Sequence, residues 1–282
     1  MSIHEETLSA RDFSRLSAFV YEEAGIRLGP EKRTMLEARL RRRLRSLNLD
    51  SYRRYCEYLL TAEGQREEMV PFLDVVTTNK TDFFREAAHF RFLAAEALPE
   101  MAARAEGRPL LIWSAGCSSG EEPYTLAMVV SEYAEAHPGF RFRILATDLS
   151  TQVLERARLG IYTAESVEPV PPGLRKKYLL RSRDRGSNQV RVAPELRRLV
   201  EFRRLNFMDA DYGLTGQADA IFCRNVLIYF DRATQEAILR KLTRHLAPLG
   251  YLFVGHSETL HDMQLPLTAR GPALYRRHHG HG

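Results

Sequence analysis

Residues 111–124 have the sequence Leu-Ile-Trp-Ser-Ala-Gly-Cys-Ser-Ser-Gly-Glu-Glu-Pro-Tyr, which predicts an apolar strand, a turn of small residues and the start of a helix. Apolar side chains recur at helical spacing after the turn, and Pro123 stands where a first-turn proline is tolerated because its missing N–H would have no partner. Such a turn presents free backbone N–H groups, and Gly116 and Gly120 would let a ligand approach the main chain. No Lys-Ser/Thr pair follows Gly120, which excludes the phosphate loop of an NTPase, and the spacing does not fit Gly-x-Gly-x-x-Gly. A plain structural turn remains an alternative at this point.

A second apolar run, residues 142–147, ends in Asp148 and predicts the second strand of a βαβ unit. An acid at this position commonly accepts hydrogen bonds from ribose hydroxyls, which favours a nucleoside cofactor. The alternative role for Asp148 is to cap the following helix, although Ser150 could fill that role instead. Glu121 and Glu122 favour S-adenosylmethionine over a dinucleotide, because they would repel a pyrophosphate and attract the methionyl ammonium.

Five blocks of sequence follow one another along the chain. They are Thr-Thr-Asn-Lys-Thr-Asp-Phe-Phe-Arg-Glu at 77–86, the turn at 113–124, Ala-Thr-Asp at 146–148, Cys-Arg-Asn-Val-Leu-Ile-Tyr-Phe at 223–230 and Gly-His-Ser-Glu at 255–258. Together they resemble the CheR-type chemoreceptor glutamate O-methyltransferases. The resemblance implies a class I S-adenosylmethionine-dependent methyltransferase, which is a Rossmann-like α/β fold with a mostly parallel seven-stranded sheet. The implied reaction methylates receptor glutamate side chains in chemotaxis-type signalling and leaves S-adenosylhomocysteine.

The resemblance also implies a set of cofactor-binding residues. Part of the segment 77–86 would reach over the cofactor, Glu122 would take the ammonium, and Asp148 would hold the ribose. Residues 206–207 would flank the adenine, and residues 225–226 would lie below the methionyl part. The full set is Asn79, Thr81, Arg85, Gly116, Glu122, Asp148, Asn206, Phe207, Asn225 and Val226.

Arg85 and Tyr229 are the candidates for orienting the acceptor carboxylate. A salt bridge to Glu86 or a neighbouring acid is the alternative for Arg85, and Tyr229 could be a core aromatic. A glutamate carboxylate, with a reference pKa of about 4.3, is ionised at neutral pH, so the reaction needs no general base, and none is conspicuous. Glu121 could exchange roles with Glu122.

Composition bounds the remaining possibilities. The chain has 282 residues, a net charge of +5 and three widely spaced cysteines without a Cys-x-x-Cys motif. Neither a disulfide framework nor a zinc site is indicated, and we expect no metal. No apolar stretch approaches the roughly 20 residues that cross a bilayer, and the acidic N-terminus does not resemble a signal peptide. We therefore expect a cytoplasmic protein without membrane insertion.

Residues 31–48 carry seven Lys or Arg against two Glu and predict a basic amphipathic helix. The expected apolar stripe and the opposite basic face consist of Leu36, Leu40, Leu44 and Leu47, and of Arg41, Arg42 and Arg45. The basic face is either a solvated surface or a docking surface for an acidic partner, for which the resemblance suggests the cytoplasmic helices of chemoreceptors. The segment has no interleaved aromatics and no nucleic-acid motif, so we expect no nucleic-acid partner.

The chain is expected to divide into three parts. Residues 1–76 are helical throughout and would form a receptor-docking domain, while residues 77–108 are a linker that carries cofactor-covering residues. Residues 109–282 would form the catalytic domain, because strands and helices alternate there. Residues 160–198 interrupt the alternation and predict a small inserted β-subdomain with a hairpin.

The tip of that hairpin, residues 181–188, contains a single glycine. Members of the resembled family that tether themselves to a receptor's C-terminal pentapeptide have a glycine-rich tip, so we expect methylation here to be independent of a pentapeptide. A CheR-like cofactor-binding scaffold or signalling module without receptor methylation is the alternative function. The intact cofactor positions argue against it.

Overall fold

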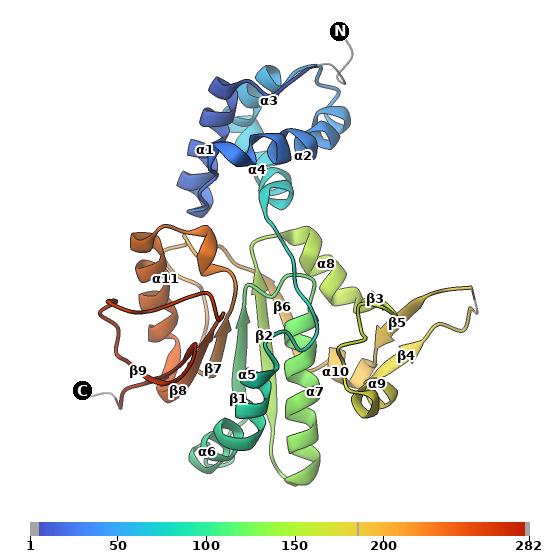
Figure 1. The fold of residues 1–282 in the computed structure, drawn as a ribbon, viewed down its shortest axis with the longest axis vertical. Coiled ribbons are helices and arrows are strands. Elements are labelled where there is room, and N and C mark those ends of the chain that lie inside the picture. Colours follow the sequence, from blue (N-terminus) through green and yellow to red (C-terminus); the bar gives the residue numbers. More distant parts are fainter. Residues whose placement is uncertain (1–5, 185, 280–282) are drawn as a thin grey trace.

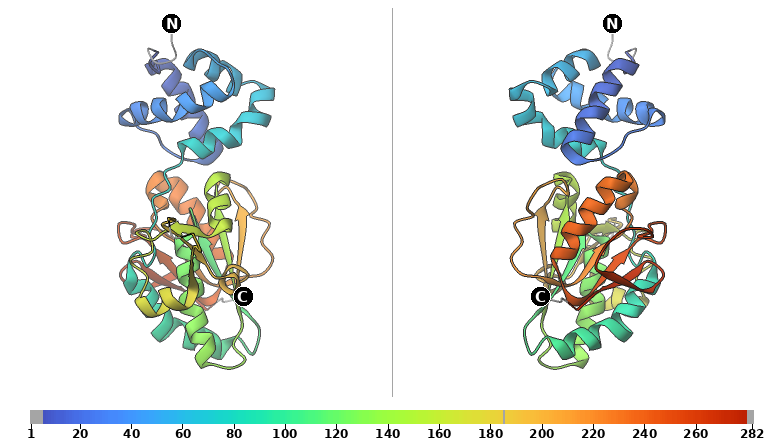
Figure 2. Two further views of the ribbon diagram at one scale, coloured as in Figure 1. Left: turned by 90° about the vertical axis from the view of Figure 1, so that its right-hand side faces the viewer. Right: turned by 90° about the vertical axis from the view of Figure 1, so that its left-hand side faces the viewer.

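The computed structural model describes residues 6–184 and 186–279. A helical bundle lies at one end of the molecule and a larger α/β domain at the other (Figure 1). The two side views show the same narrow junction between them (Figure 2). Within the described residues, none of the helices combines the length and the apolar character needed to span a bilayer.

The N-terminal bundle consists of α1 (Ala10–Ala24), the 3₁₀ turn η1 (Pro30–Lys32), α2 (Arg33–Ser46), α3 (Tyr52–Leu59) and α4 (Ala62–Val76). The side chains of Ser9, Ser51 and Thr61 cap α1, α3 and α4, because each accepts a hydrogen bond from the backbone N–H three residues further on. The cap at Thr61 fixes the start of α4 at Ala62.

The basic face of α2 is smaller than predicted. Its apolar stripe is as expected and consists of Leu36, Leu40 and Leu44, which are buried, with Leu47 partly buried. Arg41, however, donates to the carboxylate of Glu37 at 2.8 Å and to the hydroxyl of Tyr52 at 3.3 Å. Arg41 is therefore only partly exposed, because a carboxylate one helical turn away pairs with its guanidinium. Arg42 and Arg45 are exposed.

The α/β domain is built on a seven-stranded sheet with the order β6-β2-β1-β7-β8-β10-β9. The strands are β1 (Leu110–Ala115), β2 (Phe142–Asp148), β6 (Val200–Arg204), β7 (Ala218–Cys223), β8 (Leu246–Val254), β9 (Leu267–Gly271) and β10 (Leu274–Arg277). Neighbouring strands are parallel except at β10, which is antiparallel to β8 and to β9. The predicted mostly parallel seven-stranded sheet is confirmed, and β9 and β10 form an antiparallel pair at one edge of it.

Strand order determines where a ligand can enter. From β1 the chain proceeds outward through β2 to β6, and it then returns to β7 on the other side of β1. The connections after β1 and β7 therefore leave in opposite directions and open a crevice at the carboxyl ends of these strands, which is the usual ligand site of an open α/β sheet.

Helices cover both faces of the sheet. One layer consists of α5 (Ala87–Phe92), the π-helical η2 (Leu93–Ala97), α6 (Leu98–Arg104), α7 (Glu121–Ala136) and α8 (Thr151–Leu159). The layer on the other face contains α11 (Arg232–Arg244). Ile112 and Trp113 of β1 point to opposite layers and belong to different core clusters. The cluster that contains Trp113 also includes buried residues of the N-terminal bundle, so the two domains share part of their core.

The first part of the predicted linker, residues 77–86, has no regular helix or strand and runs along the α/β domain, whereas the remainder contains α5, η2 and α6. Arg39 of α2 fixes its start by donating to the backbone carbonyls of residues 75, 76 and 77 at 3.1, 2.9 and 2.8 Å. Further along, the ring of Phe83 packs edge-to-face against Tyr162, with centroids 4.9 Å apart. The linker is therefore attached to both domains.

The insertion forms a separate three-stranded antiparallel sheet in the order β3-β5-β4. Its elements are β3 (Ile161–Thr163), α9 (Pro172–Tyr178), β4 (Leu179–Arg181), β5 (Gln189–Val192) and α10 (Pro194–Arg197). The hairpin of β4 and β5 projects from the side of the molecule (Figure 1). Arg185, one of the arginines near its tip, lies outside the described residues.

Candidate functional site

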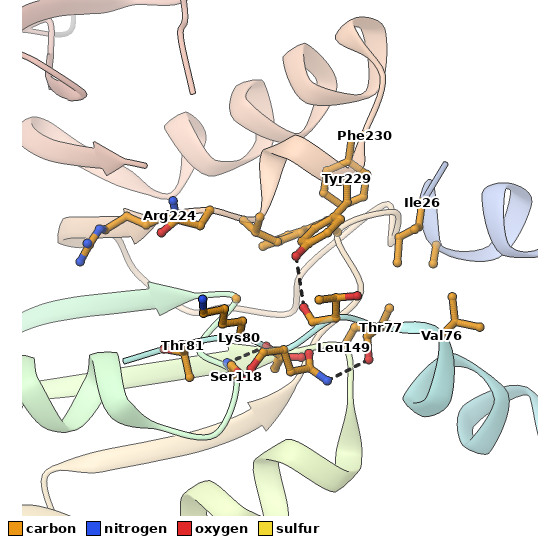
Figure 3. Close-up of a pocket in the computed structure, with 18 of the residues that line it drawn as sticks. Ile26, Val76, Thr77, Lys80, Thr81, Ser118, Leu149, Arg224, Tyr229 and Phe230 are labelled. Carbon is orange, nitrogen blue, oxygen red and sulfur yellow. Dashed lines mark hydrogen bonds between the residues drawn. The ribbon is translucent and has the colours of Figure 1, made fainter. Parts of the chain in front are cut away.

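A cavity of about 300 Å³ lies at the carboxyl ends of the central strands, between the helical bundle and the sheet. Figure 3 shows its walls, with Arg224 at one end and Ile26 of the bundle at the other. All residues that the sequence predicts for the cofactor and the acceptor line this one cavity: Asn79, Thr81, Arg85, Gly116, Glu122, Asp148, Asn206, Phe207, Asn225, Val226 and Tyr229.

The turn after β1 needs its glycines. Gly116 and Gly120 have φ angles of 90° and 101°, in the left-handed region that side chains with a Cβ rarely adopt. A Cβ on Gly116 would lie 3.3 Å from the side chain of Val226, and one on Gly120 would lie 2.8 Å from the hydroxyl of Tyr162. The turn thus packs tightly against the end of β7 on one side and against the inserted subdomain on the other.

Asp148 and Ser150 divide the two roles that their positions suggest. The Asp148 carboxylate accepts hydrogen bonds from the backbone N–H of Ser118 at 2.7 Å and of Ser150 at 3.0 Å. The Ser150 hydroxyl caps α8 by accepting from the N–H of Val153. Burial raises the pKa of Asp148, and the backbone N–H donors act in the opposite direction. The carboxylate is therefore fixed in place with acceptor capacity left toward the cavity.

The structure distinguishes Glu122 from Glu121. The Glu121 carboxylate accepts from the hydroxyl of Ser119 at 2.8 Å and does not line the cavity. The Glu122 carboxylate lines it, accepts from the hydroxyl of Ser114 at 2.7 Å and pairs with Arg224 at 3.2 Å. Burial raises the pKa of Glu122, while Arg224 and Ser114 lower it. Of the two glutamates, Glu122 is thus the one that a ligand in the cavity would contact.

Arg224 is a charged residue of the cavity wall that sequence reasoning did not predict as part of the site. It is 6% exposed, and its guanidinium lies 3.2 Å from the carboxylates of both Glu86 and Glu122. It also donates to the backbone carbonyl of Arg85. The residue stands directly before Asn225 in one of the family-like blocks, but no local pattern indicates its partners, because they are about 100 residues or more away in sequence.

Arg85 does not form the salt bridge that was its alternative role. Glu86 pairs with Arg224 instead, and Arg85 takes part in none of the ion pairs found among the described residues. Its guanidinium donates to the backbone carbonyl of Lys80 at 3.2 Å and lines the cavity. The cation is thus available to an anionic ligand.

Tyr229 lies at the rim of the cavity rather than fully inside the core. Its ring is half-buried, and its hydroxyl donates to the backbone carbonyl of Thr78 at 3.3 Å, as Figure 3 shows. Burial raises its pKa. Tyr229 therefore connects the wall after β7 to the linker.

The helical bundle supplies one end of the cavity, which sequence reasoning did not foresee. The contributing residues are Ala24, Ile26, Arg27, Leu28, Lys32 and Met35. Two hydrogen bonds seat this wall: the backbone N–H of Arg27 donates to the carbonyl of Tyr229 at 3.0 Å, and the side-chain amide of Asn206 donates to the carbonyl of Glu23 at 2.7 Å. These mostly apolar residues carry no local sign of a binding role.

Comparison with known protein families matches both parts of this architecture. Residues 11–77 match the all-alpha domain of CheR methyltransferases, and residues 79–271 match their S-adenosylmethionine-binding domain. The chain belongs to the CheR methyltransferase family. It is accordingly an S-adenosylmethionine-dependent methyltransferase, and its cavity lies mainly within the matched cofactor domain.

Relatives in this family match nearly the whole chain. The chemotaxis protein methyltransferases of Salmonella typhimurium and Escherichia coli are each 42% identical to it over 268 residues, which is 95% of this chain and 90% and 91% of those proteins. Chemotaxis protein methyltransferase 2 of Pseudomonas aeruginosa is 42% identical over 266 residues, 94% of this chain and 92% of that protein. The similarity therefore covers the bundle, the sheet and the insertion.

Proposed function

We propose that this protein transfers a methyl group from S-adenosylmethionine to glutamate side chains of chemoreceptors, which yields glutamate methyl esters and S-adenosylhomocysteine. The names of the CheR relatives support a chemotaxis substrate. The observation that carries the ester chemistry is that Arg85, a cation without a carboxylate partner among the residues that the structure describes, lines the same cavity as Glu122 and Asp148. Groups suited to an acceptor carboxylate and groups suited to the cofactor thus share one site.

The cavity has the donors and acceptors that the cofactor requires. Asp148 would accept hydrogen bonds from the ribose hydroxyls, and Glu122 would bind the methionyl ammonium. Asn206 and Phe207, which line the cavity after β6, would flank the adenine. When bound, the sulfonium supplies an electrophilic methyl group.

The acceptor side needs orientation rather than a base. A glutamate carboxylate is ionised at neutral pH, so its oxygen forms the new bond to the methyl carbon as the carbon–sulfur bond breaks, and no proton moves. Arg85 would hold the carboxylate in line with the methyl group. Tyr229, whose hydroxyl is fixed to the linker at Thr78, would form the wall against which the acceptor side chain lies.

The receptor would dock on the exposed part of α2. Arg42 and Arg45 are exposed there, whereas Arg41 is occupied within the bundle. We place the activity in the cytoplasm, on acidic helices of the receptor. The hairpin tip carries Arg181 and Arg183 and little glycine, which supports docking without a pentapeptide tether.

Methyl transfer to receptor fragments tests the function directly. Purified protein is incubated with methyl-labelled S-adenosylmethionine and receptor cytoplasmic fragments, and the label is expected to enter the receptor in a form that mild base releases, as an ester does. A matched reaction uses fragments whose acceptor glutamates are replaced by alanine. Cofactor binding without any label transfer would favour the scaffold function instead, and base-stable label would contradict ester formation.

A further inference from the structure

Glu86 connects three segments behind the cavity. It has a φ of 56° at the end of the linker, and its side chain is 13% exposed. Its carboxylate lies 3.2 Å from the guanidinium of Arg224, 3.2 Å from the side-chain amide of Asn225 and 3.3 Å from the backbone N–H of His256. Burial alone would raise the pKa of Glu86, but Arg224, the His256 backbone and Asn225 hold it below its usual range. The group is therefore a carboxylate at neutral pH.

Arg224 is shared between two carboxylates. The distance from its guanidinium is 3.2 Å to Glu86 and 3.2 Å to Glu122, and its side chain is 2% exposed. Glu122 lines the cavity, whereas Glu86 does not. A guanidinium stays protonated, so with both carboxylates ionised the three buried groups carry one positive and two negative charges. One negative charge is thus left without a cation among these three side chains.

This charge count decides what Glu122 can bind. If Arg224 faced Glu122 alone, the pair would be neutral, and Glu122 would have no uncompensated charge for an incoming ammonium. A second carboxylate, Glu86, shares the guanidinium with Glu122, so Arg224 alone does not neutralise both acids and an external cation can complete the balance. Buried ion pairs are stable only when every charge is matched, so the arrangement favours a ligand that brings one cation to Glu122.

We propose that Glu86 is a positioning residue, which shares Arg224 with Glu122 and so leaves the charge of Glu122 partly uncompensated and available to the methionyl ammonium of the cofactor. The inference rests on the proposed function, in which Glu122 receives that ammonium. Glu86 acts through Arg224 and does not touch the ligand itself.

A metal site is the competing interpretation of the same carboxylate. Glu86, His89 and His256 have ligand atoms within 4.8 Å of one another, which is the composition of a divalent-cation site. Arg224, however, already places a permanent cation 3.2 Å from the carboxylate oxygen that faces both histidines. We therefore assign the carboxylate to Arg224.

The test compares two ligands that differ only at the methionyl end. S-Adenosylhomocysteine carries the ammonium and carboxylate, whereas 5′-methylthioadenosine has the same adenosine and a thioether but neither charge. In calorimetric titrations, Glu86→Gln is expected to raise the Kd for S-adenosylhomocysteine by about tenfold or more, the loss of a charge-assisted contact. The Kd for methylthioadenosine is expected to change by less than about twofold, because Gln keeps the acceptor for Asn225 and His256.

Two further variants control for structural damage. Glu86→Asp retains the charge and is expected to restore part of the affinity lost in Glu86→Gln. His256→Ala is expected to bind both ligands normally, because His256 contributes its backbone N–H and its side chain is 50% exposed.

Several outcomes would overturn the inference. An equal loss of affinity for both ligands in Glu86→Gln would show that Glu86 only holds the fold, and unchanged affinity for both would show that it does not act on Glu122. Loss of wild-type affinity on adding a chelator would assign the cluster to a metal. Wild-type protein that does not bind S-adenosylhomocysteine at all would instead contradict the proposed function.

Discussion

At the scale of single residues, the site depends on carboxylates that the backbone fixes in place. Glu258 shows this most clearly: it accepts hydrogen bonds from the N–H groups of Gly255, Asn225 and Leu227 at 2.6, 2.9 and 2.7 Å. These bonds hold Asn225 at a φ of 57°, an unusual value for a residue with a side chain. Strain at the end of β7 is thus offset by a buried acid that has no contact with the cavity.

Replacing Asp148 by alanine should weaken cofactor binding. The variant loses a fixed acceptor for the ribose, which should cost about 1.5–3 kcal/mol of binding free energy. Titration calorimetry with S-adenosylhomocysteine measures the change, and Asp50→Ala, an exposed acid of the N-terminal bundle, is the matched control. Unchanged affinity in Asp148→Ala would remove this residue from the ribose site.

Arg85→Ala should depress turnover more than it destabilises the fold, since its guanidinium lines the cavity and its one hydrogen bond is to the Lys80 carbonyl. Initial rates of receptor methylation are compared with melting temperatures, and a fall of at least about tenfold in rate is expected, equivalent to 1.4 kcal/mol. Arg85→Lys keeps the charge and should retain more activity. A variant with normal rate and a lowered melting temperature would indicate a structural role.

His89 should make the protein less stable in mild acid. Burial, with Arg224 nearby, lowers the pKa of His89 from 6.5 to about 4. Below about pH 6.5 the unfolded chain therefore binds a proton at this residue, whereas the folded chain binds it only near pH 4. Stability is therefore complete above pH 6.5 and is lost as the pH falls toward 4. Between about pH 7.5 and pH 5 this amounts to about 2 kcal/mol. Urea unfolding should show that His89→Phe loses less stability over this range than the wild type, and equal pH slopes would contradict the assignment.

At the scale of elements, α2 has one role in the fold and one proposed role in docking, and its composition does not separate them. Arg39 and Arg43 face the bundle, where Arg39 donates to the carbonyls at the end of α4 and Arg43 donates to the buried carboxylate of Glu68 at 2.7 Å. Arg42 and Arg45 are exposed. The arginines of α2 thus hold the start of the linker in place on one side and are exposed to solvent on the other.

Reversing the exposed charges should separate these functions. The double variant Arg42→Glu and Arg45→Glu should lower methylation of receptor fragments while leaving the Kd for S-adenosylhomocysteine unchanged. Wild-type methylation should also fall with added salt, because screening limits such contacts to about 8 Å at physiological ionic strength. Arg143→Glu is the control, because Arg143 is exposed and lies near the start of β2, at the other end of the strand from the cavity residue Asp148. If methylation is insensitive both to salt and to the double variant, the basic face is only solvated.

At the scale of the whole molecule, the cavity exists because the two domains are held together. Besides the bonds at Arg27 and Asn206, Asp74 of α4 accepts from both the N–H and the hydroxyl of Thr151 at 2.7 Å each. The C-terminal end of α1 fits closely against the catalytic domain at Gly25, where a Cβ would lie 2.7 Å from the sulfur of Met208. The cofactor site is therefore expected to respond to changes at this interface.

Gly25→Ala should weaken cofactor binding from outside the cavity. Gly25 has a φ of 69°, so alanine there adds backbone strain of about 1–2 kcal/mol and a clash with Met208. Gly107→Ala is the matched control, because Gly107 has a φ of 78° and no atom within 4 Å of an added Cβ. Both variants should lose stability in thermal unfolding, but only Gly25→Ala should also raise the Kd for S-adenosylhomocysteine. Equal cofactor affinity in the two variants would show that the interface does not shape the site.

The fold class and the place of the crevice can be predicted from local patterns in the sequence. Strand, turn and helix follow one another within residues 111–124, and the periodicities that distinguish them are local, so they are visible without any tertiary contact. The positions of Gly116 and Asp148 follow from the same local logic, because a turn that presents its main chain and an acid at a strand end are recognisable from neighbours in sequence. Both residues then line one cavity because β1 and β2 are neighbours in the sheet.

Two features depend on the tertiary structure: which charged side chains pair with one another, and which residues of the bundle form the end of the cavity. Glu86 and Arg224 form an ion pair across 138 positions, and Ile26 of the bundle reaches the same cavity as Phe207 of the catalytic domain. Arg41 and Arg42 are adjacent in the chain, yet one is taken up by Glu37 and Tyr52 while the other is exposed. Such pairings have no periodic signature, because they depend on how two separately patterned domains pack, and the energy of a charge is set by the groups that surround it in space.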